Sequence, residues 1–385
     1  MDFTLTDEQR MLKESARKLV AREIEPYLAG FPKDRAMTPD EIKGLLKLCL
    51  PLGYLGSILP EAYGGAGLDF TTWALLMEEM NPYIYLLIML TVVPAIAINA
   101  TGTEEQKRKF IPELISGERI GFGAITEPNV GSHTAAMETR ATLEGDHYTI
   151  NGSKMWITNG AFADLGTLLA NTAPEKGARG LCSFIVDKNV SPFQAKATPI
   201  LGDDPRMPHV GELRFEDCRV PAENRLGNPG EGLKNTLILF QIGRCLVALN
   251  SVIYAQQALD AAVRYARERT QFGKPIGQFQ LIQQKIADMA ALTDASRLLT
   301  YRAISLVDQG RRCPAEASMA KFYATEAAIE VTSMAIQVHG AYGLSEEYPV
   351  ERLFRGARVM TIPDGTTEIQ KLIVAREYLG MPAFV

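Results

Sequence analysis

The stretch RATLEGDHYTINGSKMWITNG, Arg140 to Gly160, is where the chain changes its hydrophobic period. Short alternating runs, typical of strands, are divided there by Gly145-Asp146 and by Asn151-Gly152, and Asn-Gly is the strongest short hairpin signal. LCSFIVDK and GELRFEDCRVP continue the alternation to about Pro221. The pattern predicts a small β domain, a barrel or sandwich, of about 100 residues.

The chain before this stretch has a helical pattern. Thr6 and Gln9 have the spacing of a capping box, and apolar residues at helical spacing follow until Pro26, which we expect to end the helix. The most apolar run, Tyr83 to Ile98, is shorter than the roughly 20 residues that span a bilayer and includes Pro94. It predicts a buried helix, and we expect no membrane association.

After about Gly230 the helical period returns. One long helix is predicted to end before Phe272-Gly273, and three more helical patterns follow, at 278–309, 314–338 and 366–379. Four long helices in sequence predict a four-helix bundle. The fold class is therefore α+β multidomain, with an N-terminal all-α domain, a central β domain and a C-terminal helical bundle, at 1–120, 121–228 and 229–385.

Composition excludes several classes of function. The chain has 385 residues, 46% hydrophobic content and a net charge of −5 without a Lys/Arg run, which argues against nucleic acid as a partner. Five scattered cysteines and four scattered histidines fit free thiols and no metal site. The first residues, MDFTLTDEQRML, have no signal-peptide pattern, so we expect a cytoplasmic protein.

Two polar loops flank the predicted hairpins. Neither GxGxxG nor GxxxxGK[ST] occurs, so a nucleotide would be held by other means. AITEPNVGSH, Ala124 to His133, is rich in hydroxyls and backbone N–H groups that can hold the polar edge of a planar ligand. In MWITNG, Met155 to Gly160, Trp156 can pack against an aromatic ring and Thr158 can hydrogen-bond its rim. An ordinary turn and a core tryptophan are the alternatives.

Four motifs in one order resemble the acyl-CoA dehydrogenase family of flavoproteins: TEPxxGS, MWITNG, ARERTQFGKPIGQFQ and GTTEIQ. The resemblance covers essentially the whole chain and implies the fold of that family. It also implies FAD held between the β domain and the helical bundle, an acyl-CoA substrate, and an electron-transferring flavoprotein as electron acceptor. Contacts to the FAD of a neighbouring subunit imply a dimer or a tetramer, and the tetramer is the commoner form.

The resemblance assigns residues by motif position. Those that match FAD contacts are Ala124, Ile125, Thr126, Ser132, Trp156, Thr158, Arg269, Phe272, Gln337, Gly340, Thr366 and Glu368. Those that match acyl-CoA contacts are Ser132, Gly243, Arg244 and Gly365. The chain departs from the family at His133, where Asp is usual, at Ala341, where Gly is usual, and in Gly202 to Phe215, which lacks the usual serines.

The segment IPDGTTEIQ, Ile362 to Gln370, contains the expected catalytic base. Most members of the family have Glu where this chain has Asp364, and some place Glu at the position of Gly243. Asp364 is therefore the only carboxylate at either base position of the family. Its backbone N–H matches a donor to the thioester oxygen.

Aspartate shortens the reach of the base by about 1.5 Å, whereas a base must approach within about 2.6–3.2 Å of its proton's partner. A bulky acyl group could close this gap, and Gly243 and Pro363 would widen the pocket. The resemblance to cyclohexanecarboxyl-CoA dehydrogenases therefore favours an alicyclic acyl-CoA such as cyclohexane-1-carboxyl-CoA. The alternatives are an α-branched or short-chain acyl-CoA, a nitroalkane-type flavin oxidase, and a flavin-binding protein without turnover in which Asp364 only caps a helix.

Overall fold

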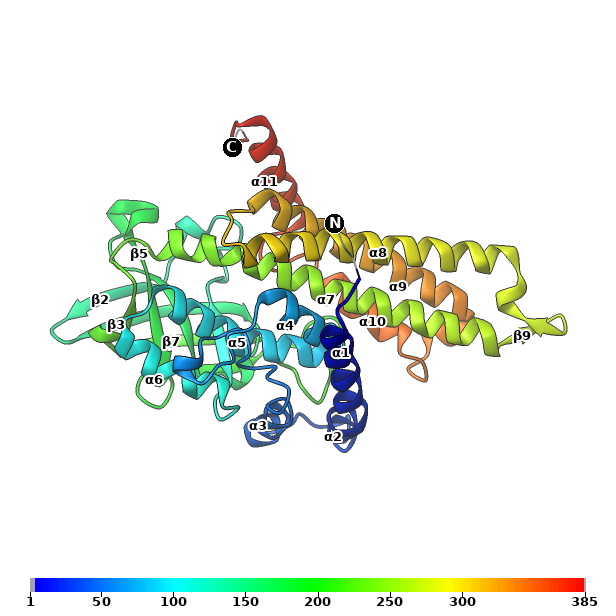
Figure 1. Ribbon diagram of the computed structural model, residues 1–385. Coiled ribbons are helices and arrows are strands. Elements are labelled where there is room, and N and C mark those ends of the chain that lie inside the picture. Colours follow the sequence, from blue (N-terminus) through cyan, green and yellow to red (C-terminus); the bar gives the residue numbers. More distant parts are fainter. Residues whose placement is uncertain (1–3, 384–385) are drawn as a thin grey trace. The chain divides into compact units, whose positions relative to one another are not determined.

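The computed structural model describes residues 4–383, and the chain divides into two compact units, Met1–Leu239 and Phe240–Val385. Along the chain, helices come first, a sheet follows, and long helices end the chain (Figure 1). The predicted fold class is therefore confirmed. The boundaries predicted for three domains stay predictions, because the first compact unit contains both the N-terminal helices and the sheet.

The N-terminal part of the first unit consists of helices. They are α1 (Asp7–Leu19), α2 (Glu25–Ala29), α3 (Pro39–Leu48), α4 (Phe70–Met77), α5 (Pro82–Thr101) and α6 (Glu104–Ile115). The predicted capping box is present, with the backbone N–H of Gln9 donating to the Thr6 hydroxyl. The predicted end before Pro26 is wrong: a π-helical turn leads into α2, where proline near the N-terminus removes only an N–H that the helix leaves unpaired.

Helix α5 contains the apolar run of the sequence and is buried as predicted. Both α5 and α7 (Gly232–Glu268) have the length and hydropathy of a membrane span, and 67% and 61% of those windows lie buried inside the protein. Such burial is typical of core helices, which have the same composition as membrane spans. The sequence of α5 is therefore accounted for by packing.

The sheet of the first unit has eight strands in the order β6-β7-β3-β2-β4-β5-β8, with β1 pairing in parallel to β4. Phe193 packs between Phe122 and Phe215 in its core. The strands are β1 (Gly121–Ala124), β2 (Arg140–Glu144), β3 (His147–Ile157), β4 (Leu165–Asn171), β5 (Leu181–Asp187), β6 (Gln194–Ala197), β7 (Gly211–Pro221) and β8 (Arg225–Leu226).

Of the two glycine-containing dipeptides that predicted turns, only one forms a turn. Gly145 and Asp146 form the turn between β2 and β3, with φ of 65° at the glycine. Asn151-Gly152 lies inside β3, so its prediction as a hairpin turn is wrong. The pairing of β3 with β7 is irregular between Ile150 and Gly152, and an added β-carbon at Gly152 would meet Thr139. The glycine therefore serves a bulge and a close approach of two chain segments.

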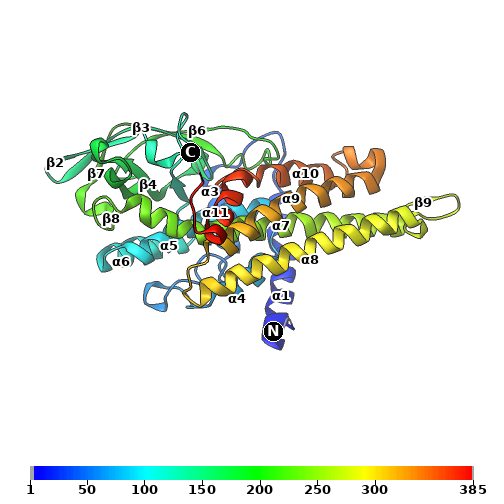
Figure 2. The same cartoon turned by 90° about the horizontal axis from the view of Figure 1, so that it is seen from above.

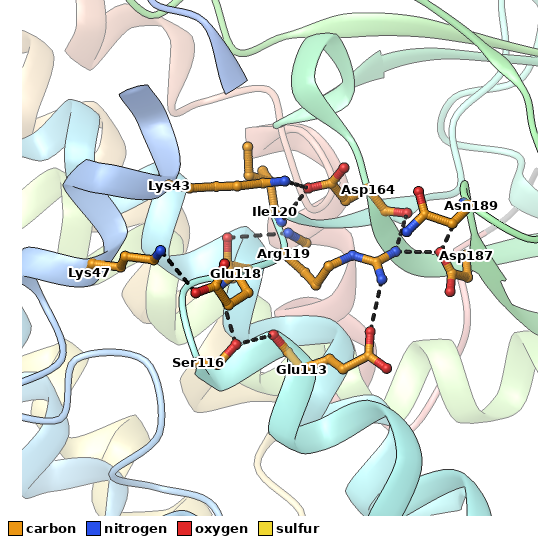
Figure 3. A network of polar contacts seen from close by, with 12 residues as sticks. Lys43, Lys47, Glu113, Ser116, Glu118, Arg119, Ile120, Asp164, Asp187 and Asn189 are labelled. Carbon is orange, nitrogen blue, oxygen red and sulfur yellow. Dashed lines mark hydrogen bonds and ion pairs between the residues drawn. The ribbon is translucent and has the colours of Figure 1, made fainter. Parts of the chain in front are cut away.

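Ion pairs connect the helices of the first unit to its sheet (Figure 3). Lys43 of α3 pairs with Asp164, which precedes β4, at 2.9 Å. Arg119 pairs with Glu113 of α6 at 2.8 Å and with Asp187 at the end of β5. Because Arg119 and Asp187 are largely shielded from water, these contacts fix the helices on the sheet more firmly than exposed pairs would.

The second unit is built from helices. Besides the greater part of α7, they are α8 (Gln280–Asp308), α9 (Pro314–His339), α10 (Val350–Val359) and α11 (Thr367–Leu379). The long helices α7, α8 and α9 run side by side in both views (Figures 1 and 2), whereas α11 runs across their direction in Figure 1. The predicted helices at 278–309, 314–338 and 366–379 are confirmed within two residues at each end. Helix α10 was not predicted. A short hairpin, β9 (Thr270–Gln271) with β10 (Lys274–Pro275), joins α7 to α8.

Candidate functional site

A buried ion pair in the first unit anchors the loop that follows β1. The Lys154 ammonium lies 2.9 Å from Glu127 Oε1 and also donates to the Ile125 carbonyl at 3.0 Å. The Glu127 carboxylate accepts the backbone N–H groups of Glu138 and Thr139. Burial would raise the pKa of Glu127, but the Lys154 charge and these donors lower it overall. Burial lowers the pKa of Lys154 to about 8.

The same network brings the two predicted flavin loops together. The backbone N–H of Met155 donates to the carbonyl of Thr126 at 2.9 Å, so Trp156 follows directly on the anchored segment. Trp156 has φ of 62°, a left-handed conformation that costs a non-glycine residue free energy, and its side chain is 53% exposed. A strained backbone that presents a large exposed ring is typical of a ligand site.

Asn159 holds the other end of this segment. It is buried with φ of 63°, and its Nδ2 donates to the carbonyls of Leu87 and Gly121 at 3.1 and 2.9 Å. Its Oδ1 has no partner among the described residues. The loop therefore has fixed backbone on both sides of Trp156 and Thr158.

The remaining predicted residues of this unit lie on the same two segments. Ala124 ends β1 and is buried, Ile125 and Thr126 are half-buried, and Ser132 is exposed beyond the turn that Glu127 and Val130 close. Within residues 4–383, the hydroxyls of Thr126, Ser132 and Thr158 make no hydrogen bond to protein. An exposed indole beside unpaired hydroxyls fits a planar cofactor with polar edges, such as the flavin of FAD.

The predicted base lies in the second unit, on the loop before α11. Asp364 has φ of 55° and Gly365 has φ of 94°. A β-carbon added at Gly243 of α7 would overlap Oδ2 of Asp364 and lie 3.3 Å from its Cγ. The absent side chain at 243 therefore makes room for the carboxylate itself. The expectation that Gly243 widens the pocket for substrate is wrong in this respect.

Two buried cations face the Asp364 carboxylate. Burial raises the pKa of Asp364, while the charges of Arg244 on α7 and Lys321 on α9 act to lower it. Burial in turn lowers the pKa of Arg244, whose Nε has no partner in the described part of the chain. A carboxylate whose pKa is raised by burial and that lies near two buried cations is suited to general-base catalysis.

Lys321 and Gln370 hold the backbone of the Asp364 loop, and both side chains are fully buried. Lys321 Nζ donates to the carbonyls of Thr361 and Gly365 at 2.8 and 3.0 Å. Gln370 Nε2 donates to the carbonyls of Asp364 and Gly365, both at 2.9 Å. The backbone N–H of Asp364 has no acceptor among residues 4–383.

The other predicted residues of the second unit lie away from this loop or at its end. Thr366 is at the N-cap position of α11 without a capping hydrogen bond to its side chain in the part of the chain that the structure describes, and the exposed Glu368 is in the first turn. Arg269 packs over the Tyr342 ring, and Phe272 is 92% exposed with φ of 52°. Gln337 and Gly340 are exposed at the C-terminal end of α9.

Sequence reasoning missed the residues that support the site: Lys154, Asn159, Lys321 and Gln370. Lys154, Asn159 and Lys321 act on segments far along the chain, so no local spacing indicates their partners. Gln370 acts on the loop just before its own helix, five and six residues away. A signal was present for Lys154 and Lys321, because each stands in an otherwise buried pattern where an unpaired charge would be costly.

Comparison with known proteins finds three matching sequence profiles of one family. They are the N-terminal, middle and C-terminal domains of acyl-CoA dehydrogenase, over residues 6–118, 123–218 and 230–379. The chain is 38% identical to cyclohex-1-ene-1-carbonyl-CoA dehydrogenase of Syntrophus aciditrophicus, over 97% of this chain and 91% of that protein. It is 36% identical to the CarC subunit of the caffeyl-CoA reductase–Etf complex of Acetobacterium woodii, over 96% and 98%.

Among solved structures, the chain is similar to butyryl-CoA dehydrogenase from Megasphaera elsdenii. The TM-score is 0.92 and the sequence identity 35%, with 98% of this chain and 100% of that chain covered. The similarity includes both compact units.

Proposed function

Because the chain belongs to the acyl-CoA dehydrogenase family and is an FAD-dependent oxidoreductase, we propose that it dehydrogenates an alicyclic acyl-CoA, such as cyclohexane-1-carboxyl-CoA to cyclohex-1-ene-1-carboxyl-CoA. The observation that carries this proposal is the position of Asp364, whose carboxylate lies against Gly243 of α7. The chain is also similar to a cyclohex-1-ene-1-carbonyl-CoA dehydrogenase.

The chain's own residues would act on the α-proton of the thioester. The ionised Asp364 carboxylate accepts this proton, and the free backbone N–H of Asp364 can donate to the thioester oxygen as negative charge develops there. FAD supplies the acceptor for the hydride that leaves the β-carbon. Thr126, Ser132, Trp156 and Thr158 would hold FAD on the first unit. Arg269, Phe272, Gln337, Gly340, Thr366 and Glu368 would hold it on the second unit or on that of a neighbouring subunit.

The substrate class follows from where the base stands. Asp364 lacks one methylene relative to glutamate, and its carboxylate is directed onto the helix at Gly243. Proton transfer needs a close approach, on the order of 3 Å. A ring or branch at the α-carbon makes the acyl group bulkier, and we propose that this bulk shifts the group in its pocket and brings the α-proton to a base that is set back. Ser132, Arg244 and Gly365 are the further residues that we assign to the acyl-CoA.

We assign an electron-transferring flavoprotein as the electron acceptor, a cytoplasmic location and a homotetrameric state. A relative is a subunit of a complex with Etf. The 92% exposure of Phe272 at the tip of the β9–β10 hairpin suits contact with a second copy. Light scattering of the purified protein tests the assembly, and a monomer would contradict it.

The decisive experiment is anaerobic reduction of the purified flavoprotein. Cyclohexanecarboxyl-CoA, butyryl-CoA, isobutyryl-CoA and nitroethane are each added, and bleaching of the flavin band is followed. Fast bleaching by the ring substrate is the expected result, and Asp364→Asn should abolish it with FAD retained. In Asp364→Glu, preference should move toward butyryl-CoA.

Three outcomes would overturn parts of the proposal. Faster bleaching by isobutyryl-CoA or butyryl-CoA would replace the alicyclic substrate by a branched or straight one. Bleaching by nitroethane with rapid reoxidation in air would indicate a nitroalkane-type oxidase. No bleaching by any of the four compounds would indicate a flavin-binding protein in which Asp364 has no catalytic role.

A further inference from the structure

The loop that carries Asp364 is held by two different side chains. The hydrogen bond from the Thr367 N–H to the Thr361 carbonyl, 3.2 Å long, closes its ends. Between these ends, Lys321 and Gln370 together donate four hydrogen bonds to three backbone carbonyls. Such contacts hold Asp364 in its left-handed conformation, which is unfavourable for a non-glycine residue.

The two side chains differ in charge. Gln370 satisfies two carbonyls as a neutral donor, so hydrogen bonding alone does not require a cation at this place. A buried ammonium is costly to desolvate, and Lys321 has no exposed surface. Its protons are directed to carbonyls, and no ion pair joins it to Asp364 within the described residues. Its charge therefore acts on the Asp364 carboxylate through space.

The charged groups around Lys321 come from four elements. Asp364 on the loop, Glu326 on α9 and Glu368 on α11 favour its charge, while Arg244 on α7 disfavours it. Burial is the largest influence and lowers the pKa of Lys321 to about 8. Lys321 is therefore charged below about pH 8, the range in which Asp364 must be ionised to accept a proton.

We propose that Lys321 is a positioning residue for Asp364, in two separable ways. Its hydrogen bonds fix the loop, and its positive charge keeps the Asp364 carboxylate ionised at lower pH than burial alone would allow. The inference rests on the proposed role of Asp364 as the base, and it goes beyond that role by assigning a function to Lys321, which has no exposed surface.

The test compares Lys321→Gln, Lys321→Arg and Gln370→Met. The first readout is the rate of anaerobic flavin bleaching as a function of pH, whose acidic limb is the fall in rate at low pH. The second readout is the infrared carboxyl band of Asp364 without substrate, obtained as the difference from Asp364→Asn, which reports the ionisation of Asp364 directly. In Lys321→Gln the midpoint of the acidic limb and the pH at which Asp364 ionises should both rise by about one pH unit, because a nearby cation is lost. In Lys321→Arg neither value should change. In Gln370→Met the rate should fall about tenfold with the acidic limb unchanged.

Two results would overturn the inference. One is an acidic limb in Lys321→Gln that coincides with the wild-type limb while the rate falls at every pH, which would leave Lys321 a structural role only. The other is a rise in the midpoint of the acidic limb in Lys321→Arg, where the charge is kept. This second result is informative even if Lys321→Gln does not fold. Failure of the proposed function would be recognised by a different result: the flavin of the Asp364→Asn variant would then be bleached at the wild-type rate.

Discussion

The carboxylate of Asp364 occupies the space that a side chain at position 243 would fill. A β-carbon at Gly243 would overlap Oδ2 and lie 3.3 Å from Cγ. The shortened base on the loop and the missing side chain on α7 therefore form a matched pair, although 120 positions separate them along the chain.

Gly243→Ala should displace the base and slow the chemistry. A shift of about 1 Å in a catalytic group can lower the rate on the order of 100-fold, so we expect at least a tenfold slower anaerobic bleaching with FAD still bound. Gly123→Ala is a matched control, because only Thr167 Oγ1, at 3.8 Å, lies near its added β-carbon. Unchanged bleaching in Gly243→Ala would show that the loop adjusts freely.

Asp364→Asn should be more stable than the wild type at neutral pH. Burial raises the pKa of Asp364 in the folded protein, so the native state binds more protons than the unfolded state between the two pKa values. Stability from this group is thus present at acidic pH and is lost as pH rises through the raised pKa. The melting temperature of Asp364→Asn should exceed that of the wild type at pH 7, and the difference should shrink toward acidic pH. An equal or lower value at pH 7 would contradict this account.

Lys154→Met should destabilise the first unit. It leaves the Glu127 carboxylate buried without its cation, and breaking a buried pair costs about 3–5 kcal/mol. Denaturant unfolding of the holoenzyme measures the loss. The double variant Glu127→Gln/Lys154→Met is the control, and we expect it to recover part of the stability because no uncompensated charge remains.

Trp156→Ala should weaken FAD binding with little effect on the stability of the apoprotein, because the indole is 53% exposed. Aromatic packing contributes about 0.5–1.5 kcal/mol, so the dissociation constant should rise up to about tenfold. Trp156→Phe should restore most of the affinity. Titration of the apoprotein with FAD, followed by flavin fluorescence, measures both, and equal affinities in all three proteins would exclude a contact with the flavin.

The fold was predictable wherever the hydrophobic period was long and regular. The helices α8, α9 and α11 lie where helical patterns were predicted, whereas α10 was missed although Val350, Leu353 and Ala357 have helical spacing, because it is only 10 residues long. The prediction of a turn at Asn151-Gly152 was wrong because the same dipeptide occurs at hairpin turns and at places where a glycine allows two chain segments to approach closely. Local sequence cannot distinguish the two.

The positions of Asp364 and Trp156 were predictable because both stand in contiguous motifs. Asn159 and Gln370 stand in the same motifs, but their roles were missed because their partners are backbone carbonyls, which the sequence does not identify. The burial pattern around Lys321 indicated a paired charge but not the carbonyls that it bonds. What Gly243 accommodates likewise required the position of a side chain from another element.

The hold on the Asp364 loop bears on how new substrate preferences arise. Lys321 and Gln370 donate hydrogen bonds to the carbonyls of Thr361, Asp364 and Gly365, which are main-chain atoms that a substitution at position 364 leaves in place. A substitution at position 364 alone, such as Asp364→Glu, can therefore alter the length of the base while the loop keeps its shape. Diversification of acyl-CoA specificity would then need no rebuilding of the surrounding helices.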